Sequence, residues 1–307
     1  MRLVIVGAGG TGGYFGAKLA KAGEDVTFLA RGAHLAAIRE HGIRIRSKIE
    51  GEWGVKVRAV DSLANERPAD LVLFCVKSFD TESAAEAIKP VIGPATGVLS
   101  IQNGVDNEDK IARIIGAGHV LGGVAYVFSH IEEPGVIAHD QLGRIAFGEM
   151  NALASFRAGA FAEGCKRAGI PAEMATNIRK LLWEKYLSIA PISGATSLTR
   201  LPVKFIREVP ETRRFWQMEV DELLAIAERE GAGLDADMRE RCAKFLDSLA
   251  PGNYSSMYQD LAQGKRLELE ALHGYAVRRG EYYGIPTPAL FAVYAALKPH
   301  MHGRPAT

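Results

Sequence analysis

A short apolar run followed at once by closely spaced glycines opens the chain. Residues 3–6 read Leu-Val-Ile-Val, and Gly7, Gly9 and Gly12 follow in the spacing G-x-G-x-x-G, just before a helical pattern begins. In this context the first glycine turns the chain off a strand, the second lets a pyrophosphate approach the backbone, and the third lets the next helix pack closely on the sheet. That helix also presents N–H groups and the positive end of its dipole to phosphate. We therefore predict a dinucleotide site over Gly7, Ala8, Gly9, Gly10, Thr11 and Gly12.

Strand and helix patterns alternate through the first half of the chain. Asp70–Val76 is a continuous apolar run, which is typical of a central parallel strand buried on both faces. Further strands are expected over Leu3–Val6, Asp25–Ala30, Gly97–Ile101, Val120–Ser129, Val136–His139 and Arg144–Phe147, and helices over Tyr14–Ala22, His34–His41, Thr81–Ile88 and Asn107–Ile115. A half-buried hairpin is expected from Ile43–Ile49 and Val55–Val60, with Gly51 and Gly54 bounding its turn. This order predicts a doubly wound α/β sheet of the Rossmann type.

After about Asn177 the patterns become almost entirely helical. Helices are expected over Ile178–Pro191, Phe205–Gly231, Asp237–Leu249, Tyr254–Gln263 and Leu267–Tyr283. We therefore predict two domains, a dinucleotide-binding Rossmann-type domain over residues 1–177 and an all-helical domain over residues 178–307.

Composition excludes several classes of function. The 307 residues are 48% hydrophobic and 24% charged, with a formal net charge of +1, so no strong field attracts nucleic acid or a membrane surface. Cys75, Cys165 and Cys242 and the eight histidines show no metal-ligand spacing, which predicts reduced thiols and no metal site. No apolar run has the length of a signal peptide or a membrane span, and we expect a cytoplasmic protein.

The residues after the second and later strands indicate which dinucleotide binds. An acidic residue at the end of the second strand would select NAD through the ribose 2′-hydroxyl, but this strand ends in Leu29-Ala30-Arg31-Gly32. Arg31 can pair with a 2′-phosphate, and Lys77 is a second cation just past the strand Asp70–Val76. Both favour NADP(H), although Arg31 is also compatible with an ordinary surface arginine. Asn103 follows another strand and could contact the nicotinamide or substrate, or simply form an Asn-Gly turn.

These features together resemble the ketopantoate reductase (2-dehydropantoate 2-reductase) family over essentially the whole chain. The resemblance is carried by the glycine turn and four further segments: Cys75-Val-Lys77, Gln102-Asn103-Gly104, Trp183-Glu-Lys185, and Asn253-Tyr-Ser-Ser256-Met-Tyr-Gln-Asp260 with Glu268 beyond it. It implies NADPH-dependent reduction of a 2-keto acid to a 2-hydroxy acid, with 2-dehydropantoate as the family substrate in pantothenate biosynthesis. It also implies that Lys185 is the general acid, that Ser256 and Glu268 contact substrate, and that Asn103 and Lys77 face cofactor and substrate.

The chemistry of Lys185 can be considered apart from the resemblance. Hydride transfer to a ketone builds negative charge on oxygen, which requires a proton or a cation there. Lys185 lies in an otherwise apolar helical run, where partial desolvation would lower its pKa toward a useful range. The alternatives are a lysine that extends into water or an ion pair with Glu184. Ser256 and Glu268 could likewise be a helix cap and a first-turn dipole partner.

Two positions depart from the family pattern. The family commonly carries asparagines four and eight residues after the lysine, whereas this chain has Ile189 and Ser193 there. Isoleucine offers no hydrogen bond to a polar substrate group and serine only part of what an amide offers. The substrate pocket is therefore expected to be more apolar on this side. A reductase of another small keto acid or ketone is the first alternative to ketopantoate reductase, and an NADPH-binding sensor without turnover is the second.

The oligomeric state is open at this level. The long run Phe205–Gly231 carries Phe215, Met218, Leu223 and Ile226 at helical spacing. Such a stripe is read as core or as a subunit interface. The family resemblance implies that a homodimer is possible.

Overall fold

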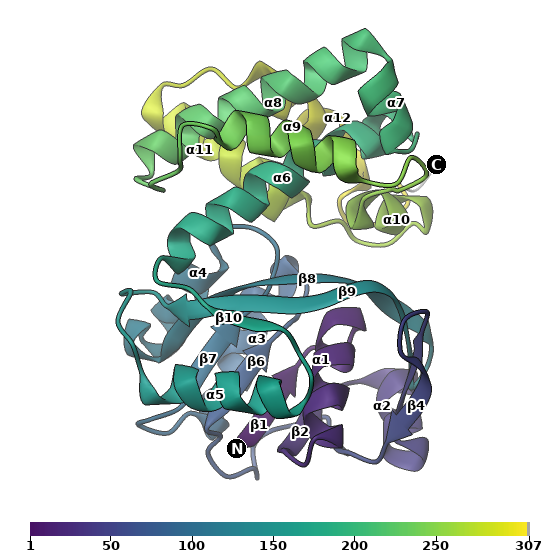
Figure 1. The fold of residues 1–307 in the computed structure, drawn as a ribbon, viewed down its shortest axis with the longest axis vertical. Coiled ribbons are helices and arrows are strands. Elements are labelled where there is room, and N and C mark those ends of the chain that lie inside the picture. Colours follow the sequence, from purple (N-terminus) through teal and green to yellow (C-terminus); the bar gives the residue numbers. More distant parts are fainter. Residues whose placement is uncertain (306–307) are drawn as a thin grey trace. The chain divides into compact units, whose positions relative to one another are not determined.

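The computed structural model describes residues 1–305, which form two compact units (Figure 1). The first, called here the α/β unit, comprises Met1–Gln102 and Asn107–Ile178. The second, the helical unit, comprises Asn103–Asp106 and the chain from Arg179 onward. No helix within residues 1–305 has the length and apolar character needed to cross a membrane.

One mixed sheet with a parallel centre organises the α/β unit. Along the sheet the strands follow the order β4-β3-β9-β8-β7-β6-β1-β2-β5, and β10 pairs with β9. The strands are β1 Arg2–Val6, β2 Asp25–Leu29, β3 Ile43–Ser47, β4 Gly51–Val55, β5 Arg58–Val60, β6 Leu71–Phe74, β7 Gly97–Ser100, β8 Val120–Glu133, β9 Val136–Glu149 and β10 Ala172–Met174. The neighbouring strands in the stretch β8-β7-β6-β1-β2-β5 are all parallel, whereas the pairs β3–β4 and β8–β9 are antiparallel.

Helices cover both faces of this sheet, which confirms the predicted doubly wound α/β fold. Alternate residues of β1 enter different cores, since Leu3 and Ile5 pack on one face and Val4 and Val6 on the other. The first core includes residues of α1 Gly10–Lys21, α2 Gly32–His41 and α5 Phe156–Arg167; the second includes residues of α3 Thr81–Ala87 and α4 Asn107–Ile115. Every residue of β6 is fully buried, as its continuous apolar sequence predicts.

The register places the carboxyl ends of the central strands at one edge of the sheet. Val6 pairs with Leu29 on one side and with Phe74 on the other, and Phe74 pairs with Ser100. The segments that follow β1, β2 and β6 therefore leave the sheet at the same edge. In an open α/β sheet this is the edge at which ligands bind.

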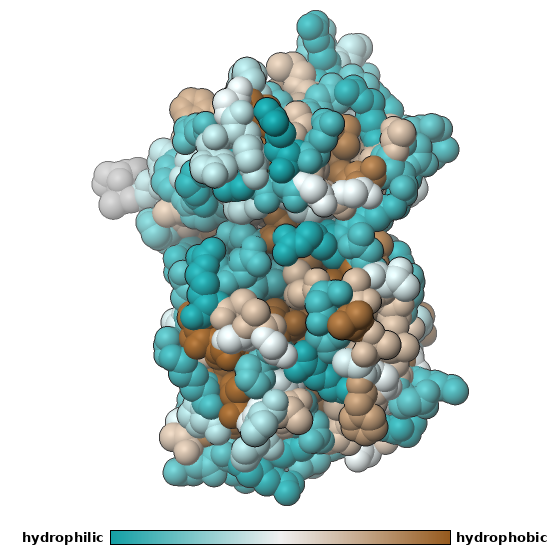
Figure 2. All heavy atoms as spheres, turned by 90° about the vertical axis from the view of Figure 1, so that its left-hand side faces the viewer, coloured by the Kyte–Doolittle hydropathy of each residue, from teal (hydrophilic) through white to brown (hydrophobic). Residues whose placement is uncertain are grey.

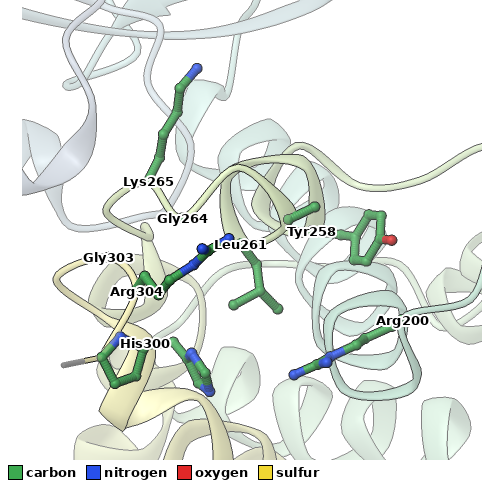
Figure 3. Close-up of a pocket in the computed structure, with 10 residues that line it drawn as sticks. Arg200, Tyr258, Leu261, Gly264, Lys265, His300, Gly303 and Arg304 are labelled. Atoms are coloured by element: carbon green, nitrogen blue, oxygen red, sulfur yellow. The ribbon is translucent and has the colours of Figure 1, made fainter. Parts of the chain in front are cut away.

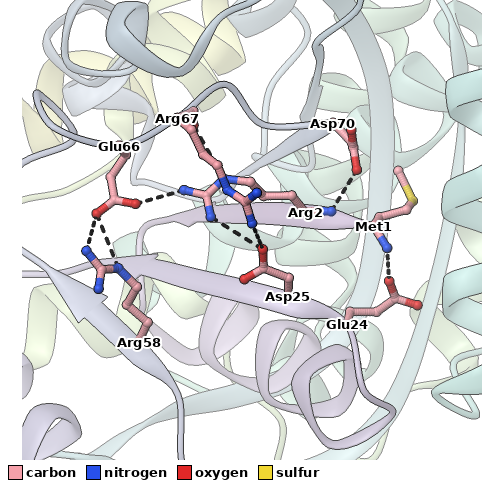
Figure 4. Close-up of polar contacts among 8 residues, drawn as sticks. All are labelled: Met1, Arg2, Glu24, Asp25, Arg58, Glu66, Arg67 and Asp70. Atoms are coloured by element: carbon pink, nitrogen blue, oxygen red, sulfur yellow. Dashed lines mark hydrogen bonds and ion pairs between the residues drawn. The ribbon is translucent and has the colours of Figure 1, made fainter.

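The opposite edge of the sheet carries a network of ion pairs (Figure 4). Arg2 at the start of β1 pairs with Glu66 (2.7 Å) and with Asp25 at the start of β2 (3.4 Å). Arg58 at the start of β5 also binds Glu66, and the main-chain nitrogen of Met1 pairs with Glu24. Charged side chains thus join the amino ends of the strands, whereas the glycine turn lies at their carboxyl ends.

Two expectations for the sheet were wrong in detail. The hairpin pairs β3 with β4, so Gly51–Val55 is its second strand, and Arg58–Val60 instead extends the parallel sheet beside β2. The two short strands expected over Val136–His139 and Arg144–Phe147 are one long strand, because β9 follows β8 through several bulges.

The helical unit is built from α6 onward, which confirms the expected all-helical C-terminal part. Its helices are α6 Ile178–Thr199, α7 Val203–Glu208, α8 Pro210–Arg229, α9 Met238–Ser248, α10 Ser256–Ala262, α11 Tyr275–Tyr283 and α12 Pro288–Leu297. A π-helical turn, Glu270–Gly274, leads directly into α11. Neither α12 nor α5 nor β10 was expected from the sequence patterns.

Two of the helix boundaries that differ from expectation involve proline. The helix expected to stop at Pro191 continues to Thr199, because residues 190–197 are all buried and their packing outweighs the roughly 3 kcal/mol that an internal proline costs. The run expected as one helix over Phe205–Gly231 is broken at Val209, since Pro210 begins α8. In that run Leu223 and Ile226 are core, whereas Met218 is exposed.

The surface of each unit is mixed in character. Figure 2 shows one face, on which hydrophilic side chains predominate and the apolar ones form separate groups among them. The exposed large apolar residues of the described chain include Phe156 on α5, Leu153 before it and Phe291 on α12. Single exposed apolar side chains are normal for a folded protein.

Candidate functional site

The glycine turn after β1 has the geometry that a dinucleotide requires. Gly7 has a φ of +96°, and a Cβ atom built on it would lie 2.7 Å from the Cys75 carbonyl carbon. A Cβ on Gly12 would collide with the carbonyl oxygen of Gly7, so a side chain is excluded where α1 packs on the turn. A Cβ on Gly9 would meet no atom within 4 Å. The turn is therefore tight on the side of the sheet and open at Gly9, where a phosphate group could approach the backbone.

Helix α1 presents its N-terminus at this turn. Gly9 is the N-cap and no side chain caps the helix, and no acidic residue lies in the first turn. The first main-chain bond of the turn runs from the Gly13 amide to the Gly9 carbonyl (2.7 Å). The N–H groups of residues 10–12 precede this bond and have no acceptor within the helix, which is the arrangement that binds anions.

Arg31 lies at the end of β2, next to a carboxylate that sequence reasoning missed. It is the N-cap residue of α2, its side chain is 85% exposed, and its guanidinium group pairs with Asp80 at 2.8 Å. Asp80 comes from the 3-10 turn Ser78–Asp80 that follows β6 and Lys77. Such an exposed pair contributes only about 0–1 kcal/mol, so Arg31 can exchange Asp80 for a phosphate group at little cost.

Gln102 joins the ends of β6 and β7. Its buried side-chain amide donates to the Val76 carbonyl and to the Thr81 hydroxyl, each at 2.9 Å. These bonds hold the loop that carries Lys77 against the segment that precedes Asn103. The sequence pattern singled out Asn103 and Lys77 but gave no role to the glutamine between the strand and the asparagine.

In the helical unit, α6 carries Lys185, Ile189 and Ser193 at intervals of four residues, which places them along one face of the helix. Lys185 and Ile189 are half-buried and Ser193 is buried. The neighbouring Glu184 accepts two hydrogen bonds from the guanidinium group of Arg241, at 2.9 and 3.0 Å. The carboxylate that the sequence offers as a partner for Lys185 is therefore engaged by α9.

Ser256 is the first residue of α10, and its neighbour supplies the cap. The Ser255 hydroxyl accepts from the Tyr258 amide at 3.1 Å and also bonds the Thr196 hydroxyl of α6 at 2.8 Å. The interpretation of Ser256 as a cap is thus wrong, and Ser256 is exposed. The bond from Thr196 ties the start of α10 to the helix that carries Lys185.

Glu268 lies just before the π-helical turn instead of inside a first helical turn. Residues 265–268 are not helical, and Glu268 is buried, with its carbonyl accepting from the Leu272 amide at 3.1 Å. The Tyr186 hydroxyl of α6 donates to the Leu272 carbonyl at 2.8 Å. This bond joins α6, where Tyr186 follows Lys185, to the π-helical turn that begins shortly after Glu268.

A buried pair of titratable side chains lies behind these elements. Glu219 of α8 and His273 of the π-helical turn are fully buried, with Oε2 and Nε2 3.1 Å apart. Burial raises the pKa of Glu219 well above its usual range and lowers the pKa of His273 to about 3. His273 is therefore neutral near pH 7, and burial favours the neutral form of Glu219. Gly194 of α6 makes room for them, because a Cβ there would lie 2.7 Å from His273 Nε2.

The environment of each cysteine disfavours its thiolate form. Burial raises the pKa of Cys75 far above its usual range, that of Cys165 to about 12 and that of Cys242 to about 11. Within residues 1–305, no three His, Cys, Asp or Glu side chains are grouped in a way that could hold a metal ion.

The candidate residues thus fall into two sets. The α/β unit holds the glycine turn, Arg31 and Lys77. The helical unit holds Asn103, Lys185, Ile189, Ser193, Ser256 and Glu268. Asn103 is the unexpected member of the second set, since it follows β7 but belongs by its contacts to the helical unit. The pKa of Tyr186, the residue after Lys185, is raised first by burial, then by Tyr275 and then by Asp106. The segment Asn103–Asp106 therefore lies near Tyr186 within the helical unit.

Comparison with known proteins covers most of the chain. The family model described as ketopantoate reductase PanE/ApbA matches residues 3–152, and the model of its C-terminal part matches residues 177–301. A 2-dehydropantoate 2-reductase from Halobacterium salinarum is 32% identical over 94% of this chain and 95% of its own length. The crystal structure of a PanE/ApbA family ketopantoate reductase from Ralstonia eutropha JMP134 matches with a TM-score of 0.90 and 34% identity, over 98% of both chains.

A more distant structure shares the fold. A ternary structure of D-mandelate dehydrogenase with NADH and anilino(oxo)acetate matches with a TM-score of 0.89 over 98% of both chains, at 23% identity. At that identity the match shows the fold alone. One fold is therefore used by proteins named for different substrates.

Proposed function

The chain belongs to the ketopantoate reductase family, and on this premise we propose that it reduces a 2-keto acid to the 2-hydroxy acid with NADPH. It is an oxidoreductase of that family, whose members use a nicotinamide cofactor. The substrate that this membership favours is 2-dehydropantoate. The observation that carries the proposal is the half-buried Lys185 on α6, within the same unit as Ser256, Glu268 and Asn103.

The residues of the α/β unit fit the cofactor. The open side of Gly9 and the uncapped N-terminus of α1 suit a pyrophosphate, and we propose that Gly7, Ala8, Gly9, Gly10, Thr11 and Gly12 hold it. Arg31 would release Asp80 and bind the 2′-phosphate instead, and this contact would favour NADPH over NADH. Lys77 would add a second cation at the same edge of the sheet. The bound nicotinamide supplies the hydride.

The residues of the helical unit would complete the reaction. As the substrate carbonyl carbon receives the hydride, its oxygen becomes an alkoxide, and Lys185 donates a proton to it. Glu268 would orient the Lys185 ammonium group or accept from the substrate hydroxyl. Ser256, at the first position of α10, would donate to the substrate carboxylate, and Asn103 would contact the nicotinamide or the substrate.

A second candidate function rests on Ile189 and Ser193. The half-buried Ile189 presents an apolar group where the family commonly offers an amide, and Ser193 has a single hydroxyl. Leaving a substrate hydrogen-bonding group unpaired costs about 1–3 kcal/mol. The alternative is therefore a reductase of another small keto acid that is apolar where ketopantoate is polar.

Loss of NADPH absorbance with a panel of 2-keto acids tests the proposal. The panel contains ketopantoate, its analogue without the hydroxyl group, pyruvate and phenylglyoxylate. A clearly highest kcat/KM for ketopantoate supports the first candidate, and preference for an apolar keto acid supports the second. NADPH binding without turnover of any 2-keto acid would overturn both.

A further inference from the structure

The helical unit contains a pocket that the proposed reaction does not use. It has a volume of about 230 Å³ and lies where three segments meet, namely the end of α6, the C-terminal part of α10 with the loop after it, and the end of the described chain. Its basic lining residues are Arg200, Lys265, His300 and Arg304, and its other lining residues include Tyr258 and Leu261. No aspartate or glutamate lines it.

The basic side chains of this pocket have no partner in the described part of the chain. No hydrogen bond or ion pair of residues 1–305 involves the guanidinium groups of Arg200 and Arg304, the ammonium group of Lys265 or the His300 ring. This contrasts with other arginines of the same unit, such as Arg213 and Arg241, which are paired with Asp247 and Glu184. Figure 3 shows Arg200 and His300 directed toward one another and Lys265 extending away from them.

Arg200 is held in a backbone conformation that favours glycine. Its φ is +59°, and its amide donates to the Thr196 carbonyl at 2.9 Å, which ends α6. Most helices that end in this left-handed conformation use glycine there, because every other L-residue except asparagine pays a steric cost. Arginine therefore occupies a position at which the backbone conformation favours glycine.

Two segments in close contact, residues 264–267 and residues 301–304, form part of the pocket wall. A Cβ atom on Gly303 would lie 2.9 Å from the Gly264 carbonyl oxygen, and one on Gly264 would lie 3.5 Å from Arg304 Cβ. The Leu267 amide also donates to the Met301 carbonyl at 3.0 Å. These close backbone contacts hold the segment that carries Arg304 against the loop after α10, so the pocket is shaped by the fold of the chain.

We propose that this pocket binds a small phosphate monoester whose other half is apolar. Among residues 1–305 the exposed guanidinium groups of Arg200 and Arg304 and the His300 ring have no partner, and they suit a dianion because guanidinium groups bind phosphate through paired charge-assisted hydrogen bonds. The Tyr258 ring and Leu261 supply an apolar wall for the rest of the ligand. The site is distinct from the residues assigned to the reductase reaction, and the two can be tested separately.

Isothermal titration of the full chain with phenyl phosphate and with inorganic phosphate, at constant ionic strength, tests the proposal. We expect both to bind, and phenyl phosphate to bind more tightly because its ring packs on Tyr258 and Leu261. Arg200→Gly should weaken both about tenfold or more, the loss expected for a charge-assisted hydrogen bond. This variant should fold normally, because glycine suits the backbone at position 200.

Two control variants keep the result interpretable. Ala152→Gly relaxes another residue with positive φ (+62°) without removing a charge, and its phosphate affinity should match that of the unchanged chain. Arg31→Ala tests whether the phosphate binds at the glycine turn of the α/β unit instead. The proposal is overturned if neither phosphate binds, if Arg200→Gly binds as the unchanged chain does, or if Arg31→Ala and not Arg200→Gly loses the affinity.

Discussion

Lys185 is the residue on which the proposed chemistry depends most. Removal of a general acid typically costs 10²–10⁴-fold in rate, so Lys185→Ala should lose about that factor in kcat while NADPH binding survives. Lys180→Ala is the matched control, since Lys180 lies on the same helix and pairs with Asp235 on the surface at 2.7 Å. Steady-state kinetics and cofactor fluorescence titration measure the two effects. A near-normal kcat for Lys185→Ala would show that the general-acid assignment is wrong.

Arg31 should decide the choice between the two nicotinamide cofactors. Arg31→Ala is expected to weaken NADPH by about tenfold or more, because a phosphate loses a charge-assisted partner, and to change NADH little. Arg39→Ala is a suitable control, since Arg39 lies on α2, which Arg31 precedes as the N-cap residue, and pairs with Asp61 at 3.5 Å. Equal weakening of both cofactors, measured as Kd, would contradict the phosphate role.

The buried pair Glu219–His273 predicts an unusual pH dependence. Glu219 stays protonated in the folded chain above pH 4.5, where the unfolded chain has released its proton. Raising the pH therefore favours the unfolded state, and stability falls as long as Glu219 remains protonated. Glu219→Gln removes this loss, so its stability relative to the unchanged chain should grow by up to about 1.4 kcal/mol per pH unit above 4.5. Urea unfolding of both proteins between pH 5 and 8 measures the difference, and parallel curves would contradict it.

At the level of elements, the start of α10 carries two adjacent serines with different expected roles, because Ser255 caps the helix and Ser256 is proposed to bind substrate. Ser255→Ala removes the cap bond to Tyr258 and the bond to Thr196, and should cost about 1 kcal/mol of unfolding free energy. Ser256→Ala removes an exposed hydroxyl, and should change stability by less than about 0.5 kcal/mol while raising KM for the keto acid. Denaturant unfolding and kinetics of both variants test the separation. It fails if Ser256→Ala is the more destabilising of the two.

Helix α6 shows why element boundaries could be predicted only in part. Its apolar period and the lysine within it were visible in the sequence, but its continuation through Pro191 was not. Local propensity ends a helix at an internal proline, whereas burial of the following residues against the rest of the helical unit reverses that preference. The same reasoning applies to the π-helical turn before α11, which forms around the buried His273.

Over the whole molecule, carboxylates with lowered pKa should make both units sensitive to acid. In the α/β unit burial alone would raise the pKa of Glu149, but hydrogen bonds from Arg157 and Ser155 lower it below its usual value. In the helical unit the pKa of Glu270 is about 2, because bonds from Lys298, Arg278 and Tyr294 outweigh burial. These contributions to stability are complete above about pH 4.5 and are lost as the pH falls through the folded-state pKa values.

Thermal unfolding between pH 6 and pH 2.5 measures this loss. Below about pH 4.5 the melting temperature should fall, and that of Glu149→Gln should fall less steeply because one of the titrating groups is gone. A melting temperature that does not change down to pH 2.5 would contradict the role assigned to these ion pairs.

The fold and the family could be predicted because their signals are local. The turn at Gly7, Gly9 and Gly12, the apolar strand before it and the later helical periods each depend on neighbouring residues. The strand that joins β2 as β5, the pairing of β3 with β4 and the cap at Ser255 depend instead on which distant segments meet. Sequence periodicity carries no information about that choice when several registers satisfy the same pattern.

By itself, the sequence determined that a dinucleotide-type turn opens the chain, that an α/β sheet is followed by helices, and that a lysine lies on an apolar helix. Only the tertiary structure decided that Asp80 meets Arg31, that Asn103 joins the helical unit, that Glu219 and His273 are buried together, and that two arginines, a lysine and a histidine line one pocket. The physical reason is the range of the interactions. Turns and helical faces are set within a few residues, whereas charge partners and burial are set by residues that are far apart in the chain and close only after folding.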